Sequence, residues 1–169
     1  MDYKKYIREV LDFPIKWVSF KDITPLLLEP EVFKSCIDDI SKNLVDADII
    51  LWLDARWFIF ASGVAYKLWK PFSIVRKAWK LPFKTISIDY ELEYWKNTFE
   101  LHIDTIKPWF KVAIIDDLLA TWGTALASCK LVEKLWWEVH SLNFVVNLEF
   151  LEWNKKLSWY NIKTLVNYV

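Results

Sequence analysis

The chain has 169 residues, of which 54% are apolar, and a formal net charge of zero. This length and apolar content allow a sizeable buried core and exclude a disordered chain. The equal numbers of basic and acidic residues, 22 each, argue against a nucleic-acid partner held through clustered positive charge. No apolar run approaches the roughly 20 residues that cross a bilayer, and the N-terminus lacks a signal-peptide pattern. We therefore expect a soluble cytoplasmic protein without a membrane partner.

The first half of the chain alternates between helical and strand patterns. Residues 30–44 place apolar side chains at helical spacing, which predicts an amphipathic helix. The elements expected after it are a buried strand at 48–53, a helix at 58–68, a short strand at 72–75, and an edge pairing of 98–103 with residues near 84–87.

The second half continues this alternation. The expected elements are an apolar strand at 112–115 that ends in Asp116 and Asp117, a helix at 124–135 and a strand at 139–148. Apolar strands between helices are typical of a parallel sheet covered on both faces. We expect an α/β fold in a single domain, residues 1–169, in which about residues 1–30 form an N-terminal flap.

The segment from Val112 to Thr124 carries the strongest chemical signal. A buried strand brings Asp116 and Asp117 to its carboxyl end, where α/β sheets place ligands. A short loop then opens a helix at Thr124, whose free backbone N–H groups favour an anion. Carboxylates beside an anion site suit a sugar phosphate. The pattern alone leaves an alternative open, namely a capped helix after an ordinary strand with two solvated acids.

The same segment resembles the phosphoribosyl pyrophosphate signature of type I phosphoribosyltransferases. That signature is an apolar run, two acidic residues, two apolar residues and then Ala-Thr-Gly-Gly-Thr, and this chain departs from it at Trp122. The resemblance implies the fold of that family, a mostly parallel central sheet flanked by helices with a small N-terminal hood.

Further segments resemble the adenine-specific branch of the family, in order along nearly the whole chain. They are residues 12–27, similar to its hood; 54–60, similar to its pyrophosphate loop; 75–82, similar to Val-Arg-Lys-Pro-Gly-Lys-Leu-Pro; and 90–95, similar to its mobile catalytic loop. Lys21 stands where that branch usually has arginine.

The resemblance implies a role for each matching residue. Asp116 and Asp117 would hold the ribose hydroxyl groups. Glu93 would be the acid/base group for adenine's proton, and Tyr94 would help to close the catalytic loop. The 5′-phosphate cradle would comprise Ala120, Thr121, Trp122, Gly123 and Thr124. The pyrophosphate site would comprise Arg56, Arg76, Lys77 and Lys80, and the adenine pocket Phe20, Lys21, Asp22, Ile23 and Thr24.

The implied reaction converts adenine and phosphoribosyl pyrophosphate into AMP and pyrophosphate, a step of purine salvage. Mg²⁺ is expected to act through the substrate's pyrophosphate, without a direct protein ligand. A homodimer is also what the family implies.

Tryptophan and glycine occur in abnormal numbers. The chain has twelve tryptophans and two glycines, Gly63 and Gly123, although average usage of about 7% predicts roughly 12 glycines. Under the resemblance every tryptophan falls where the family commonly has glycine. These positions are Trp17, Trp52, Trp57, Trp69, Trp79, Trp95, Trp109, Trp122, Trp136, Trp137, Trp153 and Trp159. Literal tryptophans would cost about 1–3 kcal/mol each in strain or overpacking, which predicts a poorly folded, inactive chain.

Two origins of the tryptophans remain open at this point. The gene could use UGA codons that mean glycine, translated with a table in which UGA means tryptophan. Alternatively, glycines were deliberately replaced by tryptophan.

Three alternative functions also remain. The chain could be a phosphoribosyltransferase for another purine, such as hypoxanthine or xanthine. It could be a non-catalytic protein that binds phosphoribosyl pyrophosphate, or an inactive chain if the tryptophans are literal.

Overall fold

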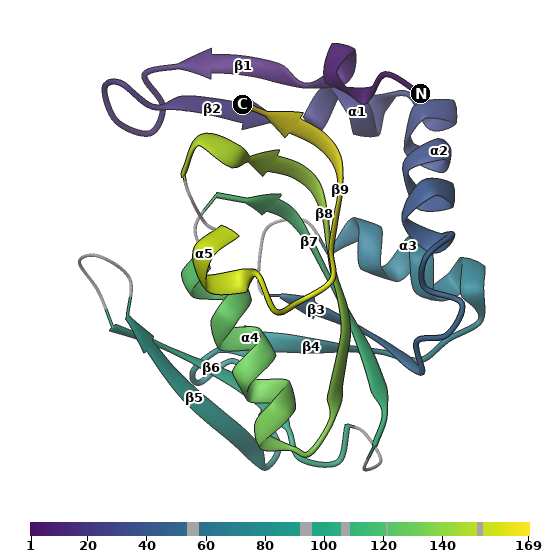
Figure 1. Cartoon of the computed structure of the whole chain (residues 1–169), viewed down its shortest axis with the longest axis vertical. Coiled ribbons are helices and arrows are strands. Elements are labelled where there is room, and N and C mark those ends of the chain that lie inside the picture. The colour runs from purple at the N-terminus through teal and green to yellow at the C-terminus, as the bar shows by residue number, and fades with distance from the viewer. Residues whose placement is uncertain (54–57, 92–95, 106–108, 121, 152–153) are drawn as a thin grey trace.

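The fold is built on one large sheet, seen in a computed structural model of the chain (Figure 1). The structure describes residues 1–53, 58–91, 96–105, 109–120, 122–151 and 154–169. The sheet has seven strands in the order β5-β6-β4-β3-β7-β8-β9. They are β3 (Ile49–Leu53), β4 (Phe72–Lys77), β5 (Thr85–Glu91), β6 (Lys96–His102), β7 (Lys111–Leu119), β8 (Glu138–Leu148) and β9 (Ile162–Tyr168).

Most of this sheet is parallel, as the apolar strand pattern predicts. Strands β4, β3, β7, β8 and β9 run parallel to their neighbours. Strand β6 is antiparallel to β4, and β5 is antiparallel to β6. The predicted edge pairing is confirmed, since Thr85 lies opposite His102 and Ser87 opposite Glu100.

Helices cover both faces of the sheet and enclose two apolar clusters. Helices α2 (Pro30–Ser41) and α3 (Ile59–Leu68) pack together against one face, and α4 (Trp122–Lys134) covers the other with α5 (Asn154–Leu157) beside it (Figure 1). The first cluster contains Ile40 and Val64, and the second contains Leu131 and Phe144. None of the helices in the described ranges is long and apolar enough to cross a membrane.

A small N-terminal unit precedes this body. It consists of the 3₁₀ turn η1 (Tyr3–Tyr6), the antiparallel strands β1 (Arg8–Leu11) and β2 (Ser19–Asp22), and the short helix α1 (Thr24–Leu28). The hairpin lies next to the carboxyl end of β9 (Figure 1). The side chain of Tyr3 holds the unit to α2, because its hydroxyl oxygen lies 2.8 Å from Ser35 Oγ and also donates to Asp39.

Several predicted boundaries were wrong. Helix α2 ends at Ser41 rather than at Leu44, and strand β4 continues to Lys77 rather than ending at Val75. Strand β7 does not end at Asp116 and Asp117 but continues to Leu119, because its pairing with β8 extends to Leu119 opposite Asn147. Helix α4 begins at Trp122 rather than at Thr124. The sequence patterns also missed the strand pair β1–β2, the short helices η1, α1, η2 (Glu149–Leu151) and α5, and the strand β9.

We predict that the buried face of α4 contributes strongly to stability. Leu131 is fully buried in the second cluster, whereas Lys130 beside it is exposed. Leu131→Ala should lower the free energy of unfolding by about 2–5 kcal/mol, because it removes apolar contacts and leaves a cavity. Lys130→Ala is the matched control and should change it by less than about 0.5 kcal/mol. Urea denaturation measures both, and equal small losses would contradict this packing.

Candidate functional site

The strand order reverses between β3 and β7, the place where an open α/β sheet has its ligand crevice. The chain passes from β3 to β4 on one side, but from β7 to β8 and β9 on the other. In open α/β sheets ligands bind outside the carboxyl ends of the strands at such a reversal. The register brings the ends together, because Trp52 of β3 lies opposite Ile115 of β7 and Leu53 opposite Val75 of β4.

Two neighbouring acids follow Ile115 at this crevice. Asp116 and Asp117 are both half-buried, and the backbone N–H of Asp117 donates to Asp116 Oδ1 at 2.9 Å. Burial, reinforced by the charge of Asp117, raises the pKa of Asp116 well above its ordinary value. The pair therefore favours ligands that donate hydrogen bonds, because a neutral donor stabilises two adjacent carboxylates without adding negative charge.

The turn after β7 leads directly into the first residues of α4. Ala120 is half-buried, and Gly123 is buried at the start of the helix. Thr124 is half-buried, with its carbonyl accepting from Ser128 Oγ at 2.8 Å. The structure thus places a helix N-terminus, which attracts anions, close in sequence to the acid pair. Thr121, predicted in the same cradle, lies outside the described residues.

Trp122 occupies the first position of this helix. Its ring is half-buried, and the amine of Lys156 lies 3.6 Å from the ring centroid. A cation over an indole face is a favourable contact. The indole therefore occupies space at the helix N-terminus together with a positive charge from the α5 region.

Basic side chains lie on the other side of the crevice. Arg76 and Lys77 are the last residues of β4, one and two positions beyond Val75, and Arg76 is half-buried opposite Glu100 of β6. Lys77 and Lys80 are exposed. The remaining predicted residues of the pyrophosphate and catalytic groups, Arg56, Glu93 and Tyr94, lie outside the described residues.

The predicted adenine residues belong to the N-terminal hairpin and the turn after it. Phe20 is half-buried and packs edge-to-face on Phe13 with ring centroids 5.3 Å apart, and Ile23 is buried. Asp22 accepts from the backbone N–H of Thr24 at 2.9 Å and from Arg8 Nη2 at 2.5 Å. Burial alone would raise the pKa of Asp22, but the hydrogen bonds from Thr24 and Arg8 outweigh it and lower that pKa.

Lys21 makes contacts that the sequence did not indicate. Its amine pairs with Glu9 at 2.9 Å and lies 4.4 Å from the ring centroid of Tyr168 in β9. The Lys21 side chain is only 8% exposed. Tyr168 therefore joins the hairpin to the body, and no local motif marks it.

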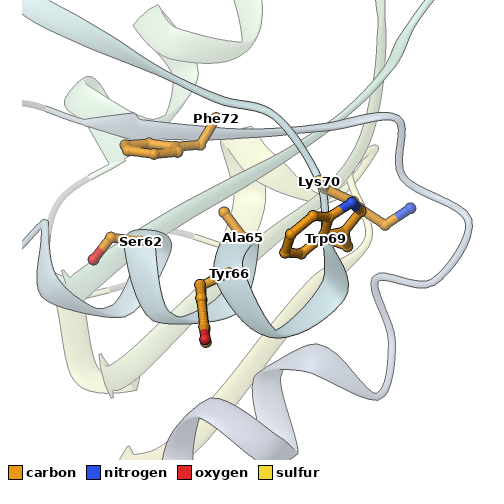
Figure 2. A pocket seen from close by; sticks show the side chains of 6 residues that line it. All are labelled: Ser62, Ala65, Tyr66, Trp69, Lys70 and Phe72. Atoms are coloured by element: carbon orange, nitrogen blue, oxygen red, sulfur yellow. The ribbon is translucent and has the colours of Figure 1, made fainter.

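A separate groove lies at the opposite end of the strands. Its lining comes from the last turns of α3 and the start of β4 (Figure 2) and consists of Ser62, Ala65, Tyr66, Trp69, Lys70 and Phe72. Phe72 begins β4, whereas the crevice lies beyond the last residue of that strand. The groove is therefore not part of the candidate site.

Proteins of known identity are similar to the chain over almost its full length. The adenine phosphoribosyltransferase of Acetivibrio thermocellus is 46% identical, covering 99% of this chain and 100% of the relative. That of Methanococcus maripaludis strain C5 is 49% identical, covering 99% of each. No family model matches the sequence.

Solved structures give the same result. The crystal structure of adenine phosphoribosyltransferase from Thermoanaerobacter pseudethanolicus superposes with a TM-score of 0.93 at 44% identity, covering 99% of this chain and 98% of that one. The enzyme from Saccharomyces cerevisiae, complexed with an imino-altritol bisphosphate and adenine, has a TM-score of 0.91 at 34% identity, covering 97% and 96%. The predicted fold, a mostly parallel sheet flanked by helices with an N-terminal hood, is confirmed.

We predict a pH-dependent contribution of Asp22 to stability. Its native pKa lies below the ordinary value of 3.8, so the stabilisation is complete above that pH and is lost as the pH falls through the lower native pKa. Asp22→Asn should therefore lower the midpoint of urea unfolding at pH 7, and the difference from the parent should shrink in strong acid. Asp104→Asn, at an exposed position, is the control. A loss that is the same at every pH would show that the charge of Asp22 is not responsible.

Proposed function

Because the chain belongs to the adenine phosphoribosyltransferase family, we propose that it transfers a ribosyl 5-phosphate group from phosphoribosyl pyrophosphate to adenine. The products are AMP and pyrophosphate, as expected of a purine-salvage enzyme. The observation that carries this proposal is the acid pair Asp116–Asp117 at the strand-order reversal, followed directly by the N-terminus of α4. A complex of the relative from Trypanosoma brucei with AMP, pyrophosphate and ribose-5-phosphate supports the same ligand set.

The acid pair and α4 suit the two ends of a ribose 5-phosphate. Carboxylates accept hydrogen bonds from the ribose hydroxyl groups, whereas the helix N-terminus stabilises the phosphate's charge. We assign the hydroxyl groups to Asp116 and Asp117, and the phosphate to the turn from Ala120 to Thr124. As the bond to pyrophosphate breaks, positive charge develops on the ribose, and nearby carboxylates stabilise it electrostatically.

The basic residues suit the leaving pyrophosphate. Arg76 and Lys77 end β4 next to the crevice, and Lys80 follows shortly after them. Together with Arg56, which matches the family's pyrophosphate loop, they would neutralise the leaving group, with arginine as the bidentate partner.

Mg²⁺ fits this arrangement as a companion of the substrate. Magnesium is commonly held by one or two carboxylates and by substrate phosphates rather than by an all-protein cage. Asp116 and Asp117 supply carboxylates at the crevice. When bound, the ion would neutralise charge on the departing pyrophosphate.

The hood supplies the base site in this proposal. Phe20 offers an aromatic face, and the backbone around Ile23 can read the edge of adenine, since the Asp22 side chain is already engaged by Thr24 and Arg8. Lys21 is held by Glu9 and Tyr168, so we assign it to fixing the hairpin rather than to direct contact with the base. Glu93 would exchange the proton of adenine, and Tyr94 would close the loop over the site to exclude water.

We further propose that the protein is a cytoplasmic homodimer. The exposed face of α3 and the start of β4 carries large apolar side chains, with Tyr66 80% and Phe72 51% exposed. Together they line the groove of Figure 2, a surface suited to a second copy. Sedimentation velocity tests this assembly, and Tyr66→Lys should shift a dimer toward monomers.

We predict that Asp117→Asn lowers kcat/KM for AMP formation by about 10²-fold, because it removes a charge that stabilises the developing positive ribose. Steady-state assays with adenine, phosphoribosyl pyrophosphate and Mg²⁺ measure this effect. Asp104→Asn, on the exposed turn after β6, is the control and should keep parent activity. Competition by hypoxanthine in the same assay tests the choice of base, and preferred use of hypoxanthine would contradict the adenine assignment.

We also predict that Trp122→Gly raises the rate of AMP formation at least about tenfold, because a well-positioned phosphate site typically contributes more than ~1.4 kcal/mol. Trp109→Gly is the matched control. It removes an indole at the amino end of β7, far along that strand from the acid pair. Rates are compared per folded molecule. An equal gain in both variants would assign the effect to folding rather than to the phosphate site.

A further inference from the structure

The backbone marks a set of positions where glycine is the natural residue. Non-glycine residues with positive φ in the described chain are Asp12 and five tryptophans: Trp17, Trp69, Trp79, Trp109 and Trp136, with φ between 55° and 73°. The left-handed region is strained for most L-residues, and only glycine enters it freely. Aspartate tolerates this region through local hydrogen bonds, whereas tryptophan has no such means.

The two glycines of the sequence show the reverse pattern. Gly63 lies within α3 and Gly123 within α4, and neither has a positive φ. The left-handed positions of the described chain, Asp12 apart, are therefore all occupied by tryptophan.

Helix α3 ends in a motif that is built around glycine. The N–H of Lys70 bonds to the carbonyl of Ala65 at 3.0 Å, and the N–H of Trp69 to that of Tyr66 at 3.3 Å. These nested bonds, with Trp69 at φ 55° and ψ 43°, form a Schellman motif. The left-handed residue of that motif is usually glycine. Figure 2 shows the Trp69 ring at the end of α3 beside Lys70.

Helix α4 ends in the same way. The N–H of Trp137 bonds to the carbonyl of Val132 at 3.3 Å, and the N–H of Trp136 to that of Glu133 at 2.9 Å. Trp136, with φ 63°, holds the left-handed position. Two independent helices thus end in a Schellman motif with tryptophan in the position that glycine usually occupies.

The hairpin turn repeats the pattern in another setting. The N–H of Val18 bonds to the carbonyl of Ile15 at 3.3 Å, which closes a turn with Trp17 in the third position at φ 73°. Because Lys16, in the second position, has no positive φ, this geometry fits a type II turn, which favours glycine or asparagine in the third position.

The packing of these indoles offers little compensation, since the one cation over a ring among them in the described chain is Lys16, 5.0 Å from the ring centroid of Trp17. The five side chains are between 77% and 95% exposed. A buried indole could repay a strained backbone with apolar contact, but an exposed one cannot.

We propose that the tryptophans of this sequence stand for UGA codons that the source cell reads as glycine, so that the working polypeptide carries glycine at these left-handed positions. A change in the meaning of one codon acts wherever it occurs, so it extends to all twelve tryptophan positions. This inference rests on backbone geometry and does not depend on the reaction that the protein catalyses.

The direct test is peptide mass spectrometry on protein isolated from the cells that carry the gene. Peptides that cover positions 69 and 136 should have the masses expected for glycine. The corresponding codons in the gene should be UGA. Tryptophan in either peptide, or UGG codons, would overturn the proposal.

A second test measures whether the left-handed backbone positions require glycine, in a variant that folds. The host carries glycine at all twelve tryptophan positions, and alanine is then placed at 69, 136 or 159. Trp159 is 92% exposed but has no positive φ, so position 159 is the matched control. Alanine at 69 or 136 should lower the Tm by about 2–4 °C, because its Cβ is strained in the left-handed region. Alanine at 159 should not lower it. Equal Tm values for glycine and alanine at 69 and 136 would refute the premise.

Discussion

The parallel pairing of β3 with β7 is the constraint on which the rest of the structure depends. It makes these two strands the point where the chain reverses its direction across the sheet, with β4 on one side and β8 on the other. Basic residues therefore end β4 while acids end the apolar part of β7, on opposite sides of one crevice. The order of the strands, rather than any one loop, therefore places basic and acidic side chains on the two sides of a ligand site.

Much of this arrangement could be predicted from the sequence. The apolar runs of β3 and β7 predict buried parallel strands, and the segment from Val112 to Thr124 predicts a candidate site by its resemblance to a family. The end of β7 could not be predicted, because Asp116 to Leu119 continue the strand only through pairing with β8. The contact between Lys21 and Tyr168 could not be predicted either, since these residues meet only after the fold brings β9 to the hairpin.

Two separate lines of evidence indicate that glycine belongs at the tryptophan positions. The resemblance to a family predicts glycine at the tryptophan positions. The φ values of Trp69 and Trp136 identify the same need from the stereochemistry of one backbone, without reference to a relative. Trp52 is unfavourable for a different reason. Its indole Nε1 is buried without a hydrogen-bond partner in the described structure. The centroid of its ring also lies only 3.8 Å from that of Phe58.

The contacts of Tyr168 affect the order in which parts of the protein can fold during synthesis. The amines of Lys4 and Lys21 lie 4.5 and 4.4 Å from the centroid of its ring, so residues made first are held by one made much later. A ribosome must therefore translate through β9 before these contacts of the N-terminal unit can form. Until then the nascent chain lacks these contacts between the hairpin and the body, so the proposed base site, which includes residues of the hairpin, is incomplete.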